Sequence, residues 1–184
     1  SRDSVVKSIT GNIPNDKKVW YQKHMAQHNL PGQDLAWVEK MHNILLIRQP
    51  EEVILSYIKK YKIISITQLG YSQQNALFNI LSKGRGTTPL ILDARDVLKD
   101  PEGMLQALCA RLAIPFYKEM LTWPAGRRES DGTWGKHWYG NVEKSTGFLP
   151  YAENKHILPL EYEELLENCM EQYQQLYQHR MRVV

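Results

Sequence analysis

Two short apolar runs along the chain have the length and composition of buried strands. Asn43–Ile47 runs without interruption through four aliphatic residues, and Pro89–Leu92 opens after a turn-rich stretch and ends at Asp93. Continuous apolar runs of this length are typical of strands that are covered on both faces in a parallel sheet. Segment Lys17–Lys23 mixes β-branched and aromatic residues with polar ones, and we expect a further strand there.

Apolar residues recur at helical spacing between and after these segments. The pattern is clearest in Glu51–Tyr61, which follows Pro50, opens on two glutamates and closes on lysines, as the helix dipole favours. The same spacing predicts a short helix around residues 37–41 and longer ones at Gln68–Lys83, Glu102–Leu112 and Tyr162–Gln178. Strands that alternate with helices predict an α/β fold, with a parallel sheet covered by helices as three layers.

Composition narrows the class of protein. The chain has 184 residues and no linker rich in Gly or Ser, so we expect one domain over residues 1–184. Its two cysteines are too few for a disulfide framework, which favours a reducing, cytoplasmic setting. No apolar run approaches the ~20 residues of a membrane helix, so no membrane association is expected.

Charge is uneven along the chain. The formal net charge of +3 gives no reason to expect a nucleic-acid partner. The first 92 residues nevertheless carry 12 basic side chains against 6 acidic ones. We therefore expect an anionic ligand to lie against the first half of the chain.

Candidate chemistry lies at the predicted strand ends, because open α/β sheets bind ligands beyond the carboxyl ends of their strands. Arg48 directly follows the predicted strand Asn43–Ile47, and Ser56 lies about one and a half turns into the helix after that strand. An arginine fork and a hydroxyl beside a helix N-terminus suit a phosphate group. The alternative is that Arg48 pairs with Glu51 or Glu52 on its own helix.

Three stretches resemble one enzyme family. Residues 47–57 (IRQPEEVILSY) resemble the motif of sulfotransferases that use 3′-phosphoadenosine 5′-phosphosulfate (PAPS), and residues 88–102 are similar to a later strand and helix of that family. Trp134, Trp138 and the run Lys144–Phe148 resemble the ending of a bacterial and plant branch, some of whose members are fused to aminotransferase-type domains and named after them. The resemblance covers roughly residues 17–150 and implies a sheet of the P-loop nucleoside-triphosphate-hydrolase type.

The resemblance also implies residue roles. Arg48 and Ser56 would bind the nucleotide 3′-phosphate. Lys23 would meet negative charge on the bridging oxygen, and His24 or His28 would take the proton of the acceptor. No metal ion is needed, although His24 and His28 also have the spacing of two metal ligands on a helix, and either could be an ordinary surface or core histidine.

Two loops of the family are matched weakly or not at all. Lys144, Ser145 and Thr146 would form a late loop over the 3′-phosphate, or equally a polar turn before Phe148. Nothing before Lys17 has the form of the first strand and phosphate loop, and Gly84–Thr88 precedes its strand, so we interpret it as a turn. Either the chain is a fragment whose upstream residues supply that loop, or it is a reduced relative that no longer transfers sulfate.

The resemblance implies transfer of the sulfuryl group of PAPS to a hydroxyl or amine of a small molecule. The long irregular segment Trp123–Pro150, rich in aromatic residues, would cover or line the acceptor pocket. The alternative is a non-catalytic domain that serves as a nucleotide-binding or interaction module. A third interpretation, a nucleotide kinase or other P-loop phosphotransferase with Asp93 as a magnesium carboxylate, would need a phosphate loop that the sequence lacks.

Overall fold

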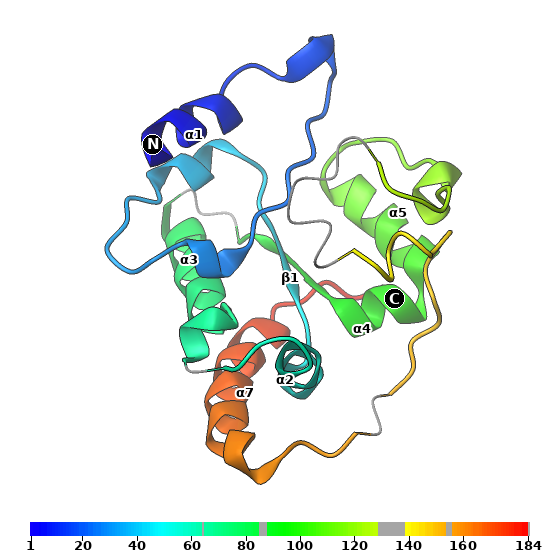
Figure 1. Cartoon of the computed structure of the whole chain (residues 1–184). Coiled ribbons are helices and arrows are strands. Elements are labelled where there is room, and N and C mark those ends of the chain that lie inside the picture. Colours follow the sequence, from blue (N-terminus) through cyan, green and yellow to red (C-terminus); the bar gives the residue numbers. More distant parts are fainter. Residues whose placement is uncertain (64, 85–87, 129–138, 154–155, 184) are drawn as a thin grey trace. The chain divides into compact units, whose positions relative to one another are not determined.

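A computed structural model describes residues 1–63, 65–84, 88–128, 139–153 and 156–183 of the chain (Figure 1). Contacts between residues divide it into two compact units. The first unit comprises Ser1–Asp93 and Asn154–Met181, and the second comprises Ala94–Glu153 and Arg182–Val184.

The first unit contains a parallel pair of strands, β1 (Ile44–Ile47) and β2 (Leu90–Asp93), which confirms two of the three predicted strands. Leu45 lies opposite Ile91 and Ile47 opposite Asp93, so these four side chains share one face of the sheet. In the described residues the sheet has two strands in the order β1-β2. The protein is therefore a mixed α/β protein with a small parallel sheet.

The predicted strand at Lys17–Lys23 is wrong. The chain there is irregular, between the 3-10 turns η1 (Pro14–Asp16) and η2 (Ala26–His28). Val19 is 52% exposed and Tyr21 is 80% exposed, so the side chains that suggested a strand bury little surface. β-propensity describes how well a side chain fits a half-buried pleated surface, and here no such surface receives it.

The predicted helices of the first unit are confirmed with shifted ends. They are α2 (Pro50–Ile58), α3 (Tyr71–Gly84) and α7 (Glu163–Tyr177), and the short helix around residues 37–41 is the 3-10 turn η3 (Ala36–Lys40). The sequence did not predict α1 (Arg2–Ile9). None of the described helices is long and apolar enough to cross a membrane.

Gly70 explains why α3 begins later than predicted. It follows the 3-10 turn η4 (Ile66–Gln68) and has a φ of 82°, which most residues rarely adopt. A Cβ atom at this position would also lie 3.2 Å from the main-chain nitrogen of Gln27. Gly70 therefore separates η4 from α3 and allows η2 to approach the start of α3 closely.

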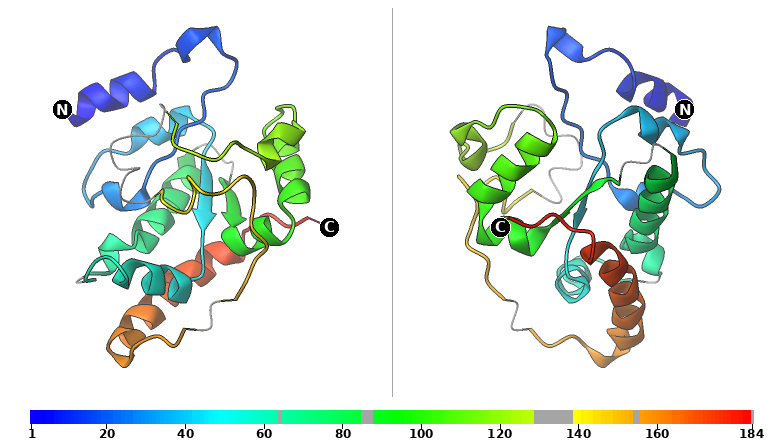
Figure 2. Two further views of the ribbon diagram at one scale, coloured as in Figure 1. Left: turned by 45° about the vertical axis from the view of Figure 1, so that its right-hand side comes forward. Right: turned by 180° about the vertical axis from the view of Figure 1, so that it is seen from behind.

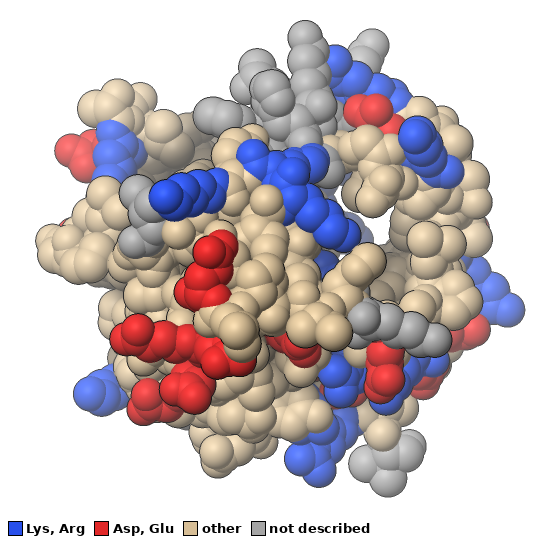
Figure 3. Space-filling model, turned by 60° about the horizontal axis from the view of Figure 1, so that its bottom comes forward, with Lys and Arg blue, Asp and Glu red and all other residues tan. Residues whose placement is uncertain are grey.

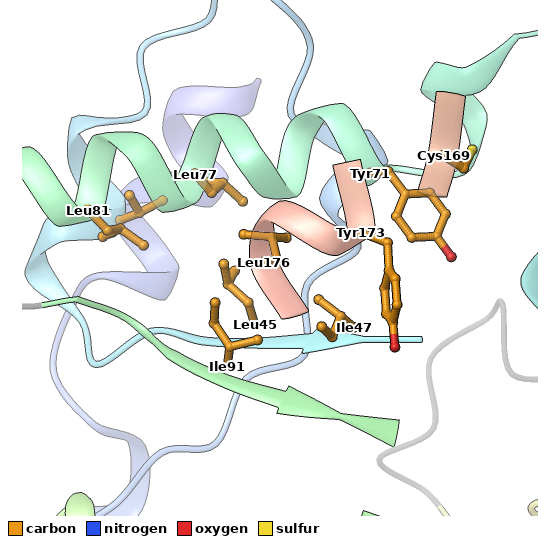
Figure 4. Packing of buried hydrophobic residues seen from close by; sticks show 10 residues of the cluster. Leu45, Ile47, Tyr71, Leu77, Leu81, Ile91, Cys169, Tyr173 and Leu176 are labelled. Carbon is orange, nitrogen blue, oxygen red and sulfur yellow. The ribbon is translucent and has the colours of Figure 1, made fainter. Parts of the chain in front are cut away.

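The main core covers the face of the sheet that carries Leu45, Ile47 and Ile91 (Figure 4). Helices α3 and α7 pack against each other on the same side of the strand pair (Figure 2). Their buried contributions are Tyr71, Leu77 and Leu81 from α3 and Cys169, Tyr173 and Leu176 from α7. A smaller cluster of Ile54, Leu55, Ile63 and Leu158 joins α2 to the segment before α7.

The outer side of α7 is acidic. Figure 3, which brings the bottom of Figure 1 forward, shows acidic side chains gathered over one part of this face. The exposed acidic residues in and before the helix are Glu161, Glu163, Glu164, Glu167 and Glu171. Those near the start of α7 stabilise it through the helix dipole, and an anionic ligand is not expected on this surface.

The second unit contains α4 (Ala94–Lys99), α5 (Pro101–Arg111) and the 3-10 turn η5 (Lys118–Leu121). The predicted helix at Glu102–Leu112 is confirmed as α5 with slightly shifted ends, and Asp100 caps it by accepting a hydrogen bond from the Gly103 amide at 3.0 Å. Residues 122–126 and 143–147 lie side by side, with main-chain bonds from Trp123 to Thr146 and from Gly126 to Glu143. Trp134, Trp138 and most of the predicted turn at 84–88 lie outside the described residues.

Both cysteines are buried as free thiols. Cys109 lies in α5 of the second unit, and Cys169 lies in the main core of the first. Burial raises the pKa of Cys169 to about 11. Its thiol is therefore neutral at physiological pH and acts as a small apolar core residue.

Candidate functional site

Arg48 stands at the carboxyl end of β1, immediately before α2. Its Nε donates a hydrogen bond to Oε2 of Glu52 at 2.8 Å. The side chain of Arg48 is 51% exposed, whereas that of Glu52 is 9% exposed. The pairing of Arg48 with its own helix is therefore real, and its partner is Glu52 rather than Glu51. The terminal amino groups of Arg48 bond to no described residue.

The main chain of Arg48 is held from the other side by α3. The Tyr71 hydroxyl donates a hydrogen bond to the Arg48 carbonyl oxygen at 2.8 Å, and the Gln74 side-chain amide donates one to the Leu46 carbonyl oxygen at 2.9 Å. Burial, more than its charged neighbours, raises the pKa of Tyr71 far above its usual value, so the hydroxyl remains a neutral donor. Tyr71 was not predicted as a site residue, because its partner lies 23 positions earlier in the chain.

Ser56 is exposed on α2, one helical turn beyond Glu52. Residues four apart on a helix share a face and are about 6 Å apart along the axis. Glu52 and Ser56 are four apart on α2, and Arg48, which precedes the helix, is paired with Glu52. The predicted phosphate site of Arg48 and Ser56 thus includes a negative charge, that of Glu52.

The predicted catalytic residues do not stand at a strand end. Lys23 and His24 are exposed in the irregular segment, and His28 is exposed at the end of η2. His24 Nε2 lies 3.1 Å from Gln22 Oε1, and the imidazole meets the Trp37 ring edge-on with centroids 5.7 Å apart. Among the described residues, no contact of His24 reaches Arg48 or Ser56.

The surroundings of His24 affect its protonation. Although His24 is exposed as a residue, partial desolvation of its imidazole beside Trp37 lowers the pKa of His24 below its ordinary value. The neutral imidazole, which can accept a proton, is therefore the main form at pH 7. In the described part of the chain, no three His, Cys, Asp or Glu side chains gather as metal ligands around His24, His28 or elsewhere.

Lys144, Ser145 and Thr146 lie in the second unit, in the turn before Phe148. The Ser145 hydroxyl accepts a hydrogen bond from Trp123 Nε1 at 3.0 Å and donates one to the Val142 carbonyl oxygen at 2.8 Å. Trp123 also meets the Phe148 ring edge-on at 5.3 Å. These contacts give Ser145 a structural role in a polar turn, and contact of this loop with a nucleotide stays a prediction.

Asp93 ends β2 as a buried carboxylate with 1% of its surface exposed. The Tyr173 hydroxyl of α7 donates a hydrogen bond to Asp93 Oδ2 at 2.6 Å. Figure 4 shows Tyr71 and Tyr173 beside the end of β1. Asp93 thus fastens α7 to the carboxyl edge of the sheet, which does not favour the proposed role as an accessible magnesium ligand.

Tyr173→Phe is expected to lower the free energy of unfolding by about 2 kcal/mol, because it removes a hydrogen bond to a buried carboxylate. Urea denaturation measures this loss. Tyr177→Phe is the matched control, since Tyr177 lies one turn further along α7 and its hydroxyl bonds to no described residue. Equal stability of the two variants would show that the bond between Tyr173 and Asp93 contributes nothing.

Comparison with known proteins finds a matching family model and similar plant proteins. A family model described as "Sulfotransferase domain" matches residues 3–180. The chain is 34% identical over 177 residues to "Branched-chain-amino-acid aminotransferase-like protein 2" of Arabidopsis thaliana, covering 96% of this chain and 31% of that protein. It is also 34% identical over 163 residues to "Branched-chain-amino-acid aminotransferase-like protein 1" of the same plant, covering 89% of this chain and 29% of the relative. The chain thus spans about a third of the length of these relatives. No solved structure matches it.

Proposed function

Because this chain belongs to the sulfotransferase domain family, we propose that it binds PAPS and takes part in transfer of its sulfuryl group to a hydroxyl or amine of a small molecule. The family match confirms the resemblance seen in the sequence, as do the relatives named after aminotransferases. The observation that carries the proposal is the exposure and hydrogen bonding of the Arg48 guanidinium. Its guanidinium is half exposed at the carboxyl end of β1, and its terminal amino groups bond to no described residue.

The residues present fit a phosphate monoester. Such a group has three free oxygens, and the two terminal amino groups of Arg48 can bind two of them end-on. The Ser56 hydroxyl, exposed on the same side of α2, can donate to the third. The 3′-phosphate of the nucleotide is the group that we assign to this position.

The proposed chemistry needs a base and a cation. PAPS supplies an activated sulfuryl group, whose sulfur bonds to the acceptor oxygen or nitrogen as its bond to the 5′-phosphate oxygen breaks. His24 or His28 takes the acceptor proton, and the lowered pKa of His24 supports that role because it keeps the imidazole neutral. The Lys23 ammonium meets the negative charge that develops on the departing phosphate oxygen.

We propose that other segments of a larger sheet and its loops complete the nucleotide site. We place β1 and β2 in a three-layer parallel sheet of the P-loop type, in which a further strand and a phosphate loop bind the 5′-phosphosulfate. Lys144, Ser145 and Thr146 would approach the 3′-phosphate, and the segment Trp123–Pro150 would line the acceptor pocket. The relatives are about three times as long as this chain, so the activity of a whole protein of that length is likewise a proposal.

One observation favours the alternative, a nucleotide-binding or interaction module without turnover. Two of the charged groups at the carboxyl edge of the sheet already have partners within the fold, Arg48 with Glu52 and Asp93 with Tyr173. Such partners stabilise the scaffold whether or not catalysis occurs. This alternative predicts nucleotide binding without sulfuryl transfer.

A thermal-unfolding comparison tests the proposal. A ligand present at a hundred times its dissociation constant stabilises the folded state by about 2.7 kcal/mol, which raises the melting temperature of a chain of this size by several degrees. We expect that increase with 3′-phosphoadenosine 5′-phosphate and a clearly smaller one with 5′-ADP, which lacks the 3′-phosphate. Equal shifts with both nucleotides would contradict the assignment of Arg48 and Ser56.

Transfer is then measured with PAPS and a panel of small alcohols, phenols and amines. Formation of a sulfated product that is lost when His24 or His28 is replaced supports the function as an enzyme. Binding without product from any acceptor favours the module.

A further inference from the structure

We propose that Glu52 is a positioning residue for Arg48: it holds the guanidinium by its Nε, so that the two terminal amino groups are presented together to an anion. The inference rests on the proposed function, since the anion in question is the nucleotide 3′-phosphate. It assigns to Glu52 an effect on ligand affinity beyond its contribution to the fold.

The guanidinium group of Arg48 has two edges that can each bind an anion through two N–H groups. A guanidinium offers a side-on edge, made of Nε and one terminal nitrogen, and an end-on edge, made of both terminal nitrogens. The 2.8 Å hydrogen bond from Nε to Glu52 occupies the side-on edge. The end-on edge remains for a ligand, and its direction is fixed by the position of the carboxylate.

Glu52 is held in place by the helix that carries it. Pro50, Ile54 and Leu55 of α2 are buried, so the helix that carries Glu52 is fixed against the core. Glu52 itself is 7% exposed, while Arg48 reaches solvent. The fixed partner therefore orders the flexible one, and the bond from Tyr71 holds the main chain of Arg48 in the same way.

Pre-ordering has a measurable consequence. A long, half-exposed arginine that is free to rotate loses rotamer entropy when a ligand immobilises it, which weakens binding. An arginine already held by Glu52 loses much less. The negative charge of Glu52 acts in the opposite direction, because it repels a phosphate nearby, so simple removal of the residue mixes two effects.

Two variants separate these effects. Glu52→Gln removes the charge and keeps a carbonyl oxygen that can accept from Nε, whereas Glu52→Ala removes both. Because both variants are neutral, the ratio of their affinities excludes the effect of the Glu52 charge and reports the loss of the side-chain oxygen that holds Arg48 Nε. The matched control pair is Glu51→Gln and Glu51→Ala, since Glu51 is the neighbouring acid in the first turn of α2 and does not bond to Arg48.

The measurement is calorimetric titration of the folded chain with 3′-phosphoadenosine 5′-phosphate. We expect Glu52→Ala to bind about fivefold to tenfold more weakly than Glu52→Gln, as loss of pre-ordering in one long side chain implies. The two Glu51 variants should agree with each other within about twofold. Equal affinity of the two Glu52 variants, or tighter binding by Glu52→Ala, overturns the inference.

A second measurement needs no ligand. The Nε–H resonance of Arg48, assigned by its loss in Arg48→Lys, should be protected from solvent exchange in the wild type and in Glu52→Gln. It should lose that protection in Glu52→Ala, although the chain remains folded. Rapid exchange in the folded wild type overturns the inference.

Arg48→Ala distinguishes failure of the proposed phosphate site from failure of the positioning role of Glu52. If this variant binds 3′-phosphoadenosine 5′-phosphate as tightly as the wild type, or if the wild type does not prefer that nucleotide over 5′-ADP, the proposed phosphate site is wrong and the role of Glu52 fails with it. If Arg48→Ala loses binding while the two Glu52 variants bind equally, the phosphate site stands and only the role of Glu52 is overturned.

Discussion

Arg48→Ala should weaken the binding of 3′-phosphoadenosine 5′-phosphate by about 2–3 kcal/mol, or roughly 30- to 150-fold. Loss of a charged bidentate contact generally costs about 2–5 kcal/mol. The lower part of that range applies here because the Arg48 side chain is 51% exposed, so solvent screens part of the interaction. Calorimetric titration at a temperature where both proteins are folded measures the difference. Ser56→Ala, which removes one neutral donor, should cost less.

The same substitution also affects stability, and a second variant separates the two effects. Arg48→Ala leaves the buried Glu52 carboxylate without this partner, which should lower the free energy of unfolding by about 1–2 kcal/mol. Arg48→Ala combined with Glu52→Ala also removes the buried carboxylate, so it should recover most of that stability and none of the binding. A folded Arg48→Ala protein with unchanged nucleotide affinity would contradict the phosphate site.

The interactions that could be predicted are local in sequence. Strand β1 follows from an apolar run, helix α2 from a proline at the first helical position, and helix α5 from apolar residues at helical spacing, all of which are local patterns. The pair between Arg48 and Glu52 is also local, because its members are four residues apart at the start of a helix. The sequence offered two partners for Arg48, and only the helix geometry decides between Glu51 and Glu52.

The interactions that could not be predicted join distant residues. The Tyr71 bond to Arg48 spans 23 positions, and the Tyr173 bond to Asp93 spans 80. No periodicity indicates which tyrosine of a helix will reach a given strand end. Segment Lys17–Lys23 failed for a related reason, since its alternating composition predicts a strand only if the rest of the fold provides a surface to cover it.

The candidate site residues also differ in whether a local pattern could place them. The motif around Arg48 lies between a strand and a helix that both form as expected, so the position of Arg48 at the strand end could be predicted, while its binding of phosphate stays a prediction. Lys23 and His24 were placed by analogy at the end of a strand that does not exist in the described structure. Their catalytic roles therefore depend on the transfer assay, whereas Arg48 already has a defined structural setting.

Leu176→Ala should lower the free energy of unfolding by about 3–4 kcal/mol. Leu176 is 0% exposed on α7 and lies between α3 and the strand pair (Figure 4). Truncation of a fully buried leucine costs about 2.7–5 kcal/mol, because the lost transfer free energy is increased by the cavity that remains. At about 2–4 °C per kcal/mol for a chain of this size, the melting temperature should fall by roughly 10 °C. Thermal unfolding followed by circular dichroism measures that change.

Gln175→Ala is the control for the same helix, because Gln175 is the neighbouring residue and is exposed. Its melting temperature should stay close to that of the wild type, since surface substitutions usually change stability by no more than about 0.5 kcal/mol. Similar melting of the two variants would contradict the position of α7 in the core. Helix α7 follows β2 by about 70 residues of sequence, yet it contacts both strands as well as α2 and α3. We therefore expect Leu176→Ala to bind nucleotide normally at low temperature and to lose binding only as it unfolds, because α7 supports the edge of the sheet that carries Arg48 without contributing a side chain to the proposed phosphate site.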